Sequence, residues 1–200
     1  MLEIKRDTIR VMWEDGKLNP NSFASSKDGR LVSVGSYWGG NGVSIWQADT
    51  GRLVRELPIG DAHMDFAADG RRLYATTGRL SPRGAECRSW WVGSWEPDRA
   101  LPLKRTSHSP AHLRVAADGT VAVLFSMNDV RLLDPESLEE LATLSAPEPG
   151  LLQGVEFSPD GATLLTTASG TVHVWDLRRL RQELAALSLD WSTARSVVRP

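Results

Sequence analysis

The histidines are the residues whose types and spacing come nearest to metal or acid–base chemistry. His63 and Asp65 lie two residues apart, and His108 and His112 lie four apart in the run Ser-His-Ser-Pro-Ala-His. On a helix, a spacing of four would direct both imidazoles to one side, as a zinc site requires. Pro110 stands between these two histidines and interrupts a helix, because it lacks the amide donor and its ring clashes with the preceding turn. We therefore predict no metal site.

The other residue types of catalysis do not form a recognisable set. His173 lies between two valines of a β-like run, where a satisfied, partly buried imidazole is expected rather than a base. The chain has no Gly-x-Ser-x-Gly elbow, no His-Glu-x-x-His motif and no phosphate-binding glycine loop, since the run Gly39–Gly42 links two expected strands. Cys87 is the single cysteine, so neither an intramolecular disulfide nor a cysteine zinc site can form. We predict that the protein is not an enzyme and binds no cofactor.

Composition excludes several other classes of protein. The 200 residues carry a formal net charge of -2, without the basic excess of proteins that bind the phosphate backbone, so we expect no nucleic-acid partner. No apolar run is long enough for a signal peptide or a membrane helix. We expect a cytoplasmic protein without membrane association, held together by its hydrophobic core.

An internal repeat organises most of the chain. The dipeptide Asp-Gly occurs four times within similar surroundings, at 28–29, 69–70, 118–119 and 160–161. The separations are 41, 49 and 42 residues, and a short β-rich run follows each dipeptide. In the last unit, Pro159 pre-sets one backbone angle, the Asp160 side chain can accept from the backbone ahead of it, and Gly161 tolerates a positive φ. Each unit therefore predicts a strand, a tight turn and a second strand.

Further apolar runs predict two more strands in a unit. The third runs of the four units are at 43–46, 87–92, 130–133 and 172–175. Polar turns then lead to a fourth run in the first and third units, at 53–57 and 138–144. No helical period interrupts the first three units, which favours an all-β array over a fold that alternates strands and helices.

The last unit resembles the Trp-Asp (WD) repeat. It contains Phe-Ser-Pro-Asp-Gly at 157–161 and Thr-Val-His-Val-Trp-Asp at 171–176. The resemblance extends over residues 8–177, and the corresponding dipeptides of the other units are Trp46-Gln47, Trp91-Val92 and Leu133-Asp134. It implies a β-propeller of about four four-stranded blades, as a small ring or a partial propeller. The Gly-His pair that commonly precedes a blade of this family is absent from all four units.

Four blades are expected, around residues 20–57, 61–103, 110–144 and 151–177. The alternating run 8–12 is expected to supply the outer strand of the last blade, because the chain passes from Trp175 directly into leucines spaced 3, 4 and 3 apart. That spacing predicts an amphipathic C-terminal helix. The chain thus divides into a propeller region, 1–177, and a helix and tail, 178–200. This ending resembles the C-terminal part of bacterial-type WD-repeat proteins, some of which carry a kinase domain.

Strands between blades are covered on both faces, and this predicts the core. The residues expected to be buried are Phe66, Val115, Val155, Phe157, Leu164, Val172, Val174 and Trp175. Trp46, Trp91 and Trp175 are expected to pack between blades. We expect an open or partnered arc rather than a closed ring of four, because blades suited to a wider ring would have to tilt sharply to close at four.

The connections between the second and third strands of the first and second units are longer than in the last unit. These two connections are expected to lie in neighbouring blades. In a propeller, the second-to-third and fourth-to-first connections emerge on the same face. Aromatic residues and arginine are enriched among interface anchors. The residues expected to bind a partner on this face are Tyr37, Trp38, His63, Arg79, Arg83, Lys104 and Arg105.

The resemblance implies a non-catalytic scaffold for protein–protein interaction, which displays these loops to a protein or peptide partner. One alternative is a structural or regulatory segment of a larger, kinase-linked signalling protein without a ligand of its own. A second alternative is a propeller enzyme with acidic or histidine side chains at the central channel. Self-association or further blades could complete the propeller. The sequence does not identify the partner.

Overall fold

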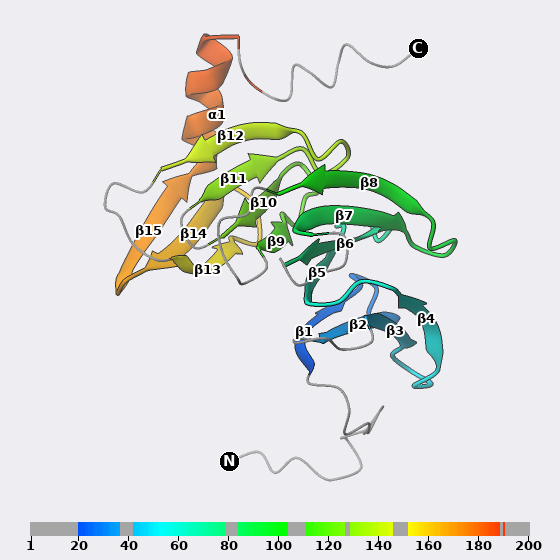
Figure 1. Cartoon of the computed structure of the whole chain (residues 1–200). Helices are drawn as coiled ribbons and strands as arrows, with labels where there is room; N and C mark the ends of the chain where they lie inside the picture. Colours follow the sequence, from blue (N-terminus) through cyan, green and yellow to red (C-terminus); the bar gives the residue numbers. More distant parts are fainter. Residues whose placement is uncertain are drawn as a thin grey trace, which may run out of the picture.

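The computed structural model describes residues 20–36, 42–78, 84–103, 111–126, 129–145, 152–188 and 190. Within these ranges the chain forms antiparallel sheets followed by a single helix (Figure 1), which confirms the expected all-β, propeller-like fold with a C-terminal helix. None of the described helical residues forms a helix long and apolar enough to cross a membrane.

Each sheet is a meander of consecutive strands, which we number as blades 1 to 4. Blade 1 contains β1 (Pro20–Ser25), β2 (Leu31–Ser36), β3 (Val43–Gln47) and β4 (Leu53–Leu57). Blade 2 contains β5 (Ala62–Phe66), β6 (Arg72–Thr77), β7 (Glu86–Trp91) and β8 (Pro97–Pro102). Blade 3 contains β9 (His112–Val115), β10 (Ala122–Phe125), β11 (Val130–Leu133) and β12 (Glu140–Leu144). Blade 4 contains β13 (Leu152–Phe157), β14 (Thr163–Ala168) and β15 (Thr171–Asp176).

The Asp-Gly turns form as the repeat predicts. In the last turn the Ser158 hydroxyl donates to Asp160 Oδ1 at 2.6 Å, and the amide of Ala162 donates to the same oxygen at 3.1 Å. Gly161 has a φ of 68°, a conformation that a residue with a Cβ rarely adopts. The Asp160 carboxylate therefore accepts hydrogen bonds from both sides of the turn and stabilises it, and the two flanking strands pair in antiparallel register.

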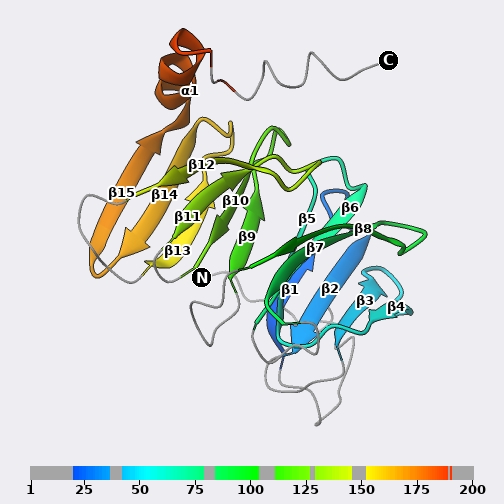
Figure 2. The ribbon, with the colours of Figure 1, turned by 45° about the horizontal axis from the view of Figure 1, so that its top comes forward.

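The blades pack face to face along an open arc, with blade 1 at one end and blade 4 at the other (Figures 1 and 2). Three apolar clusters fill the junctions between successive blades. We call the side of a blade that faces the next blade its leading face, and the opposite side its trailing face. The described strands do not close into a ring.

Half of the predicted core is confirmed. Phe66, Val155, Phe157 and Leu164 have exposed fractions of 9% or less. Phe66 lies on the trailing face of blade 2, and the other three lie on the trailing face of blade 4. The preceding blade covers each of these faces. Burial between blades follows from the repeat wherever both blades are present.

The prediction is wrong for Val172 and Val174, which are 60% and 67% exposed. Both side chains lie on the leading face of blade 4, where no further described blade packs. Val115 and Trp175 are only partly buried. Trp175 Nε1 still donates to the Thr166 hydroxyl at 3.1 Å, so its ring is fixed on the buried side of blade 4.

The expectation that Trp91 packs between blades is also wrong. Trp91 is 37% exposed, whereas its neighbour Trp90 is 4% exposed and belongs to the cluster between blades 1 and 2. Trp90 pairs with Leu73, just as Trp175 pairs with Leu164, so Trp90 is the equivalent residue. Neighbouring residues of a strand point to opposite faces, so assigning the junction position to Trp91 instead of Trp90 predicts burial on the wrong face.

The expected C-terminal helix is confirmed as α1 (Leu177–Ala186). Asp176 caps it, because its carboxylate accepts from the amide of Arg179 at 2.9 Å. Leu177 is buried in the cluster between blades 3 and 4, and Leu180 and Leu184 pack against that cluster. The run 8–12, expected as the outer strand of blade 4, lies outside the described residues. Its role and the division of the chain at residue 177 stay predictions.

Candidate functional site

The alternating strand directions give the arc two faces that carry connections. One face, which we call the turn face, carries the four Asp-Gly turns. The other, which we call the loop face, carries the connections from the second to the third strand of a blade and from its last strand to the next blade. The sequence placed the candidate binding residues on the loop face.

Most of these candidates lie outside the described residues. They are Tyr37, Trp38, Arg79, Arg83, Lys104 and Arg105. His63 is described, and it stands near the start of β5, at the loop-face end of blade 2. The gathering of all seven residues on one face therefore stays a prediction.

The ring of His63 packs against a second histidine from the neighbouring blade, at an interplanar angle of 31°. The ring centroids of His63 and His112 are 3.8 Å apart, and the His112 ring stacks in turn on Phe125 at 4.9 Å. Both histidines are six residues before the aspartate of their Asp-Gly turn, so the repeat places them at equivalent positions in blades 2 and 3. This alignment was the signal by which the sequence could have paired His63 with His112. His108, the predicted neighbour of His112, lies outside the described residues.

The environment of the histidine pair disfavours its charged form. Burial, the His112 ring and the Arg114 guanidinium together lower the pKa of His63 to about 4. Burial and Arg114 also lower the pKa of His112. Both rings are therefore neutral at pH 7, and the pair forms a rigid aromatic element at the junction of blades 2 and 3.

A carboxylate fastens the same junction below the histidines. Asp65 Oδ2 accepts from the amide of Val115 on β9 at 2.9 Å, and its Oδ1 accepts from the amide of Phe66 at 3.0 Å. Burial raises the pKa of Asp65, although these hydrogen bonds oppose the rise. The role of Asp65 is to join blades 2 and 3 by bonding to backbone, rather than to serve as a base.

Asp61 is a candidate that no sequence pattern singles out. Its side chain is 2% exposed, and neither carboxylate oxygen has a hydrogen-bond partner within the described structure. Its φ is 52°, and its carbonyl accepts from the amide of Gly78 at 3.1 Å. Burial raises its pKa. The backbone of Asp61 is thus held at the loop face, while its carboxyl group is buried without a hydrogen-bond partner among the described residues.

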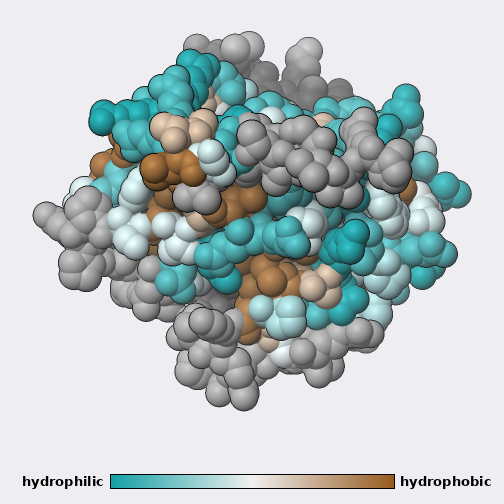
Figure 3. Space-filling view, turned by 90° about the horizontal axis from the view of Figure 1, so that it is seen from above, coloured by the Kyte–Doolittle hydropathy of each residue, from teal (hydrophilic) through white to brown (hydrophobic). Residues whose placement is uncertain are grey.

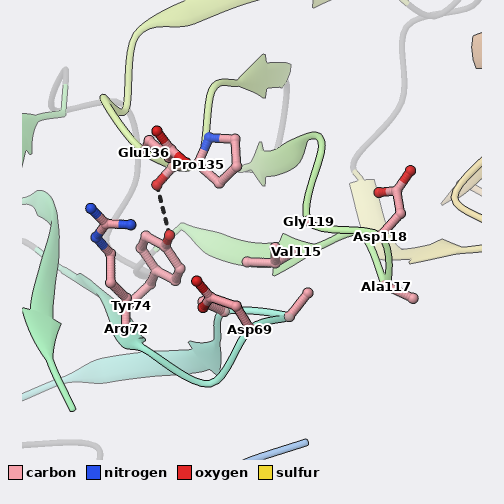
Figure 4. A pocket seen from close by; sticks show the side chains of 11 residues that line it. Asp69, Arg72, Tyr74, Val115, Ala117, Asp118, Gly119, Pro135 and Glu136 are labelled. Carbon is pink, nitrogen blue, oxygen red and sulfur yellow. Dashed lines mark hydrogen bonds between the residues drawn. The ribbon is translucent and has the colours of Figure 1, made fainter. Parts of the chain in front are cut away.

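A pocket of about 360 Å³ opens on the turn face between blades 2 and 3 (Figure 4). The polar residues around it come from both blades: Asp69, Arg72, Tyr74, Asp118 and Glu136. The Tyr74 hydroxyl donates to the Pro135 carbonyl at 2.6 Å and ties the blades together there. Three carboxylates around one tied junction suit an amine or guanidinium of a bound segment. The sequence indicated Asp69 and Asp118 only as turn residues. These two residues line the same pocket because blades 2 and 3 pack together, which no local pattern predicts.

The described arrangement offers little to nucleophilic or metal chemistry. Cys87 is fully buried, and burial raises the pKa of its thiol to about 12, so the thiolate is not available at neutral pH. No group of three or more metal-ligating side chains occurs among the residues that the structure describes. The prediction that the His173 imidazole is satisfied by hydrogen bonds is wrong. Its Nδ1 atom is buried and has no hydrogen-bond partner among the described residues.

Comparison with known proteins identifies one repeat. Residues 138–176 match the family model described as "WD domain, G-beta repeat". The matched segment begins just before β12 of blade 3 and ends with β15 of blade 4, so it joins the outer strand of one blade to the three strands of the next. A search of curated proteins found no match. The resemblance seen in the last unit is therefore confirmed for these residues.

Proposed function

Because the chain carries a WD repeat, we propose that it is a cytoplasmic, non-catalytic scaffold for protein–protein interaction. The observation that carries this proposal is the stacking of four sheets through apolar junctions, with Asp65 and Tyr74 bonding across one of them. Rigid sheets fix the positions at which the connections emerge, so little conformational entropy is lost when a partner binds.

We place the partner, a protein or peptide, on the loop face. The packed His63 and His112 rings provide a base for these connections there. The connections 37–41 and 79–83 belong to neighbouring blades and contribute Tyr37, Trp38 and two arginines. Lys104 and Arg105 follow β8 of blade 2 in the sequence, and we expect them at the same face. Aromatic rings and arginines anchor protein interfaces more often than other residues do.

Changing the loop face should weaken binding without unfolding the protein. We expect the double variant Trp38→Ala/Arg79→Glu to bind its partner at least about tenfold more weakly, because such anchors contribute more than about 1.4 kcal/mol. The free energy of unfolding should change by less than about 0.5 kcal/mol, as for other surface substitutions. The measurement compares proteins retained from a cell extract by immobilised wild type and variant, followed by titration of each purified partner.

Arg30→Glu is the matched control, since it makes the same charge change on the opposite, turn face, where the Arg30 side chain is 85% exposed and does not line the pocket. A partner that the loop-face variant loses and Arg30→Glu keeps supports the proposal. Equal loss from both variants would show that the effect is not specific to the loop face and would contradict the proposal. If neither protein retains a partner, the chain is a regulatory or structural segment without a ligand of its own. Turnover in a substrate and metal screen would instead support a propeller enzyme.

A further inference from the structure

Blade 4 leaves an apolar leading face uncovered. Leu165, Val172 and Val174 are 38%, 60% and 67% exposed, and they lie together because Leu165 pairs with Val174 on the neighbouring strand. Glu156 continues the same row on β13 and is also exposed. The face therefore has an apolar centre with one acidic residue on the inner strand.

The equivalent positions of the other blades are all buried. Leu132 pairs with Val123 in blade 3 as Val174 pairs with Leu165 in blade 4, and both are fully buried. In blade 1 the corresponding Ile45 and Ser33 are also fully buried. The neighbouring blade covers these positions in every case, so Val172 and Val174 have the side chains of a junction that lacks its second half.

Blade 1 presents the opposite situation at the other end of the arc. Its trailing face contains Phe23, which is 80% exposed, beside the partly exposed Val34 with which it pairs. Val32 and Trp46 form the next row of this face and are also partly exposed. In blade 2 the corresponding row is Phe66, Leu73 and Trp90, which blade 1 covers.

On the side of the molecule that carries β8, β12 and α1, the described residues form no continuous apolar sheet face of this kind. Seen from that side, hydrophobic residues reach the surface in separate areas between hydrophilic ones (Figure 3). Scattered apolar residues of this kind are normal on a soluble protein, whereas a whole uncovered sheet face indicates an interface.

We infer that a second copy of this chain covers both faces, so that two arcs close into one ring of eight blades. The leading face of blade 4 in each copy packs on the trailing face of blade 1 in the other. Every described junction joins one leading face to one trailing face, and the described blades leave one face of each kind uncovered. A two-fold axis relates the copies and repeats the junction twice, which closes the assembly. Eight blades lie within the range of known propellers.

The test is the mass of the 200-residue chain in solution. Sedimentation at micromolar concentration should give twice the 22.0 kDa of one chain. Val174→Lys and Phe23→Glu should each give a monomer with an unchanged circular dichroism spectrum, because both side chains are already exposed within one chain. Leu187→Glu is the control: Leu187 is 69% exposed at the C-cap of α1, outside the strands that form the two faces, and this variant should stay dimeric.

Mixing the two monomeric variants identifies which faces meet. A head-to-tail ring retains one unaltered junction in the mixed pair, so Val174→Lys and Phe23→Glu together should form a heterodimer. A monomeric wild type overturns the inference. So does a dimer that Val174→Lys abolishes and Phe23→Glu leaves intact, since that result joins two copies of blade 4 face to face. A dimer that neither variant affects overturns it as well.

Discussion

Replacing Trp90 by alanine should lower the free energy of unfolding by about 3–5 kcal/mol, the usual cost of deleting a buried aromatic side chain. Trp90 is 4% exposed and packs in the cluster between blades 1 and 2, with Phe66 and Leu73 in the same cluster. Its removal leaves a cavity at a junction that holds two blades together. Since a domain of this kind is stable by only about 5–15 kcal/mol, the loss is a large share of the total. Urea denaturation followed by tryptophan fluorescence and circular dichroism measures it.

Trp91→Ala is the control for this prediction, because it removes the same side chain from the adjacent residue. Trp91 is 37% exposed, and the guanidinium of Arg72 lies over its ring at 4.1 Å. Loss of that exposed contact should cost about 1 kcal/mol or less. Equal effects of the two substitutions would contradict the assignment of Trp90 to the junction. A larger effect of Trp91→Ala would support the original expectation from the sequence.

The contrast between these two tryptophans shows what the repeat could predict. Asp-Gly turns and β-rich runs are local signals, and they located the first three strands of each sheet together with the outer strands of blades 1 and 3, but not β8, the outer strand of blade 2. The side on which a residue points depends on register, and β6 pairs with β7 without a shift, so that Trp90 and not Trp91 lies opposite Leu73. The connection before β7 is longer than in the last unit, so the distance from the Asp-Gly turn does not show which residue of the Trp-Trp dipeptide matches Trp175.

Val172 and Val174 show a different limit. Their alternation with polar residues along β15 correctly indicates an apolar face of the kind that packs on another blade. The pattern within one strand does not indicate whether a second blade covers that face. The same holds for the site, where His63 was singled out with Asp65, its neighbour in sequence. The ring that it contacts belongs to His112, 49 residues away, and only the alignment of the repeats connects them. Local pattern predicts faces, and tertiary packing decides what covers them.

The histidine pair predicts that acid destabilises the fold. The pKa of His63 is about 4 in the folded chain, against 6.5 for an ordinary histidine, and that of His112 is lowered as well. The unfolded chain therefore binds protons that the folded chain does not, and stability present above pH 6.5 is lost as the pH falls toward 4. For His63 alone, the loss is at most about 3 kcal/mol across this window. Denaturation at pH 7 and at pH 4.5 measures the difference.

The variant His63→Gln separates this effect from the other groups that titrate nearby. The buried carboxyls of Asp61 and Asp65 have raised pKa values, so their protonation stabilises the fold as the pH falls and opposes the histidines. These contributions remain in the variant, and the difference between the two proteins isolates the imidazole. His63→Gln should lose less stability than wild type between pH 7 and pH 4.5. An identical loss in both proteins would mean that His63 takes up its proton in the folded chain as readily as in the unfolded one, and that the histidine pair does not exclude charge.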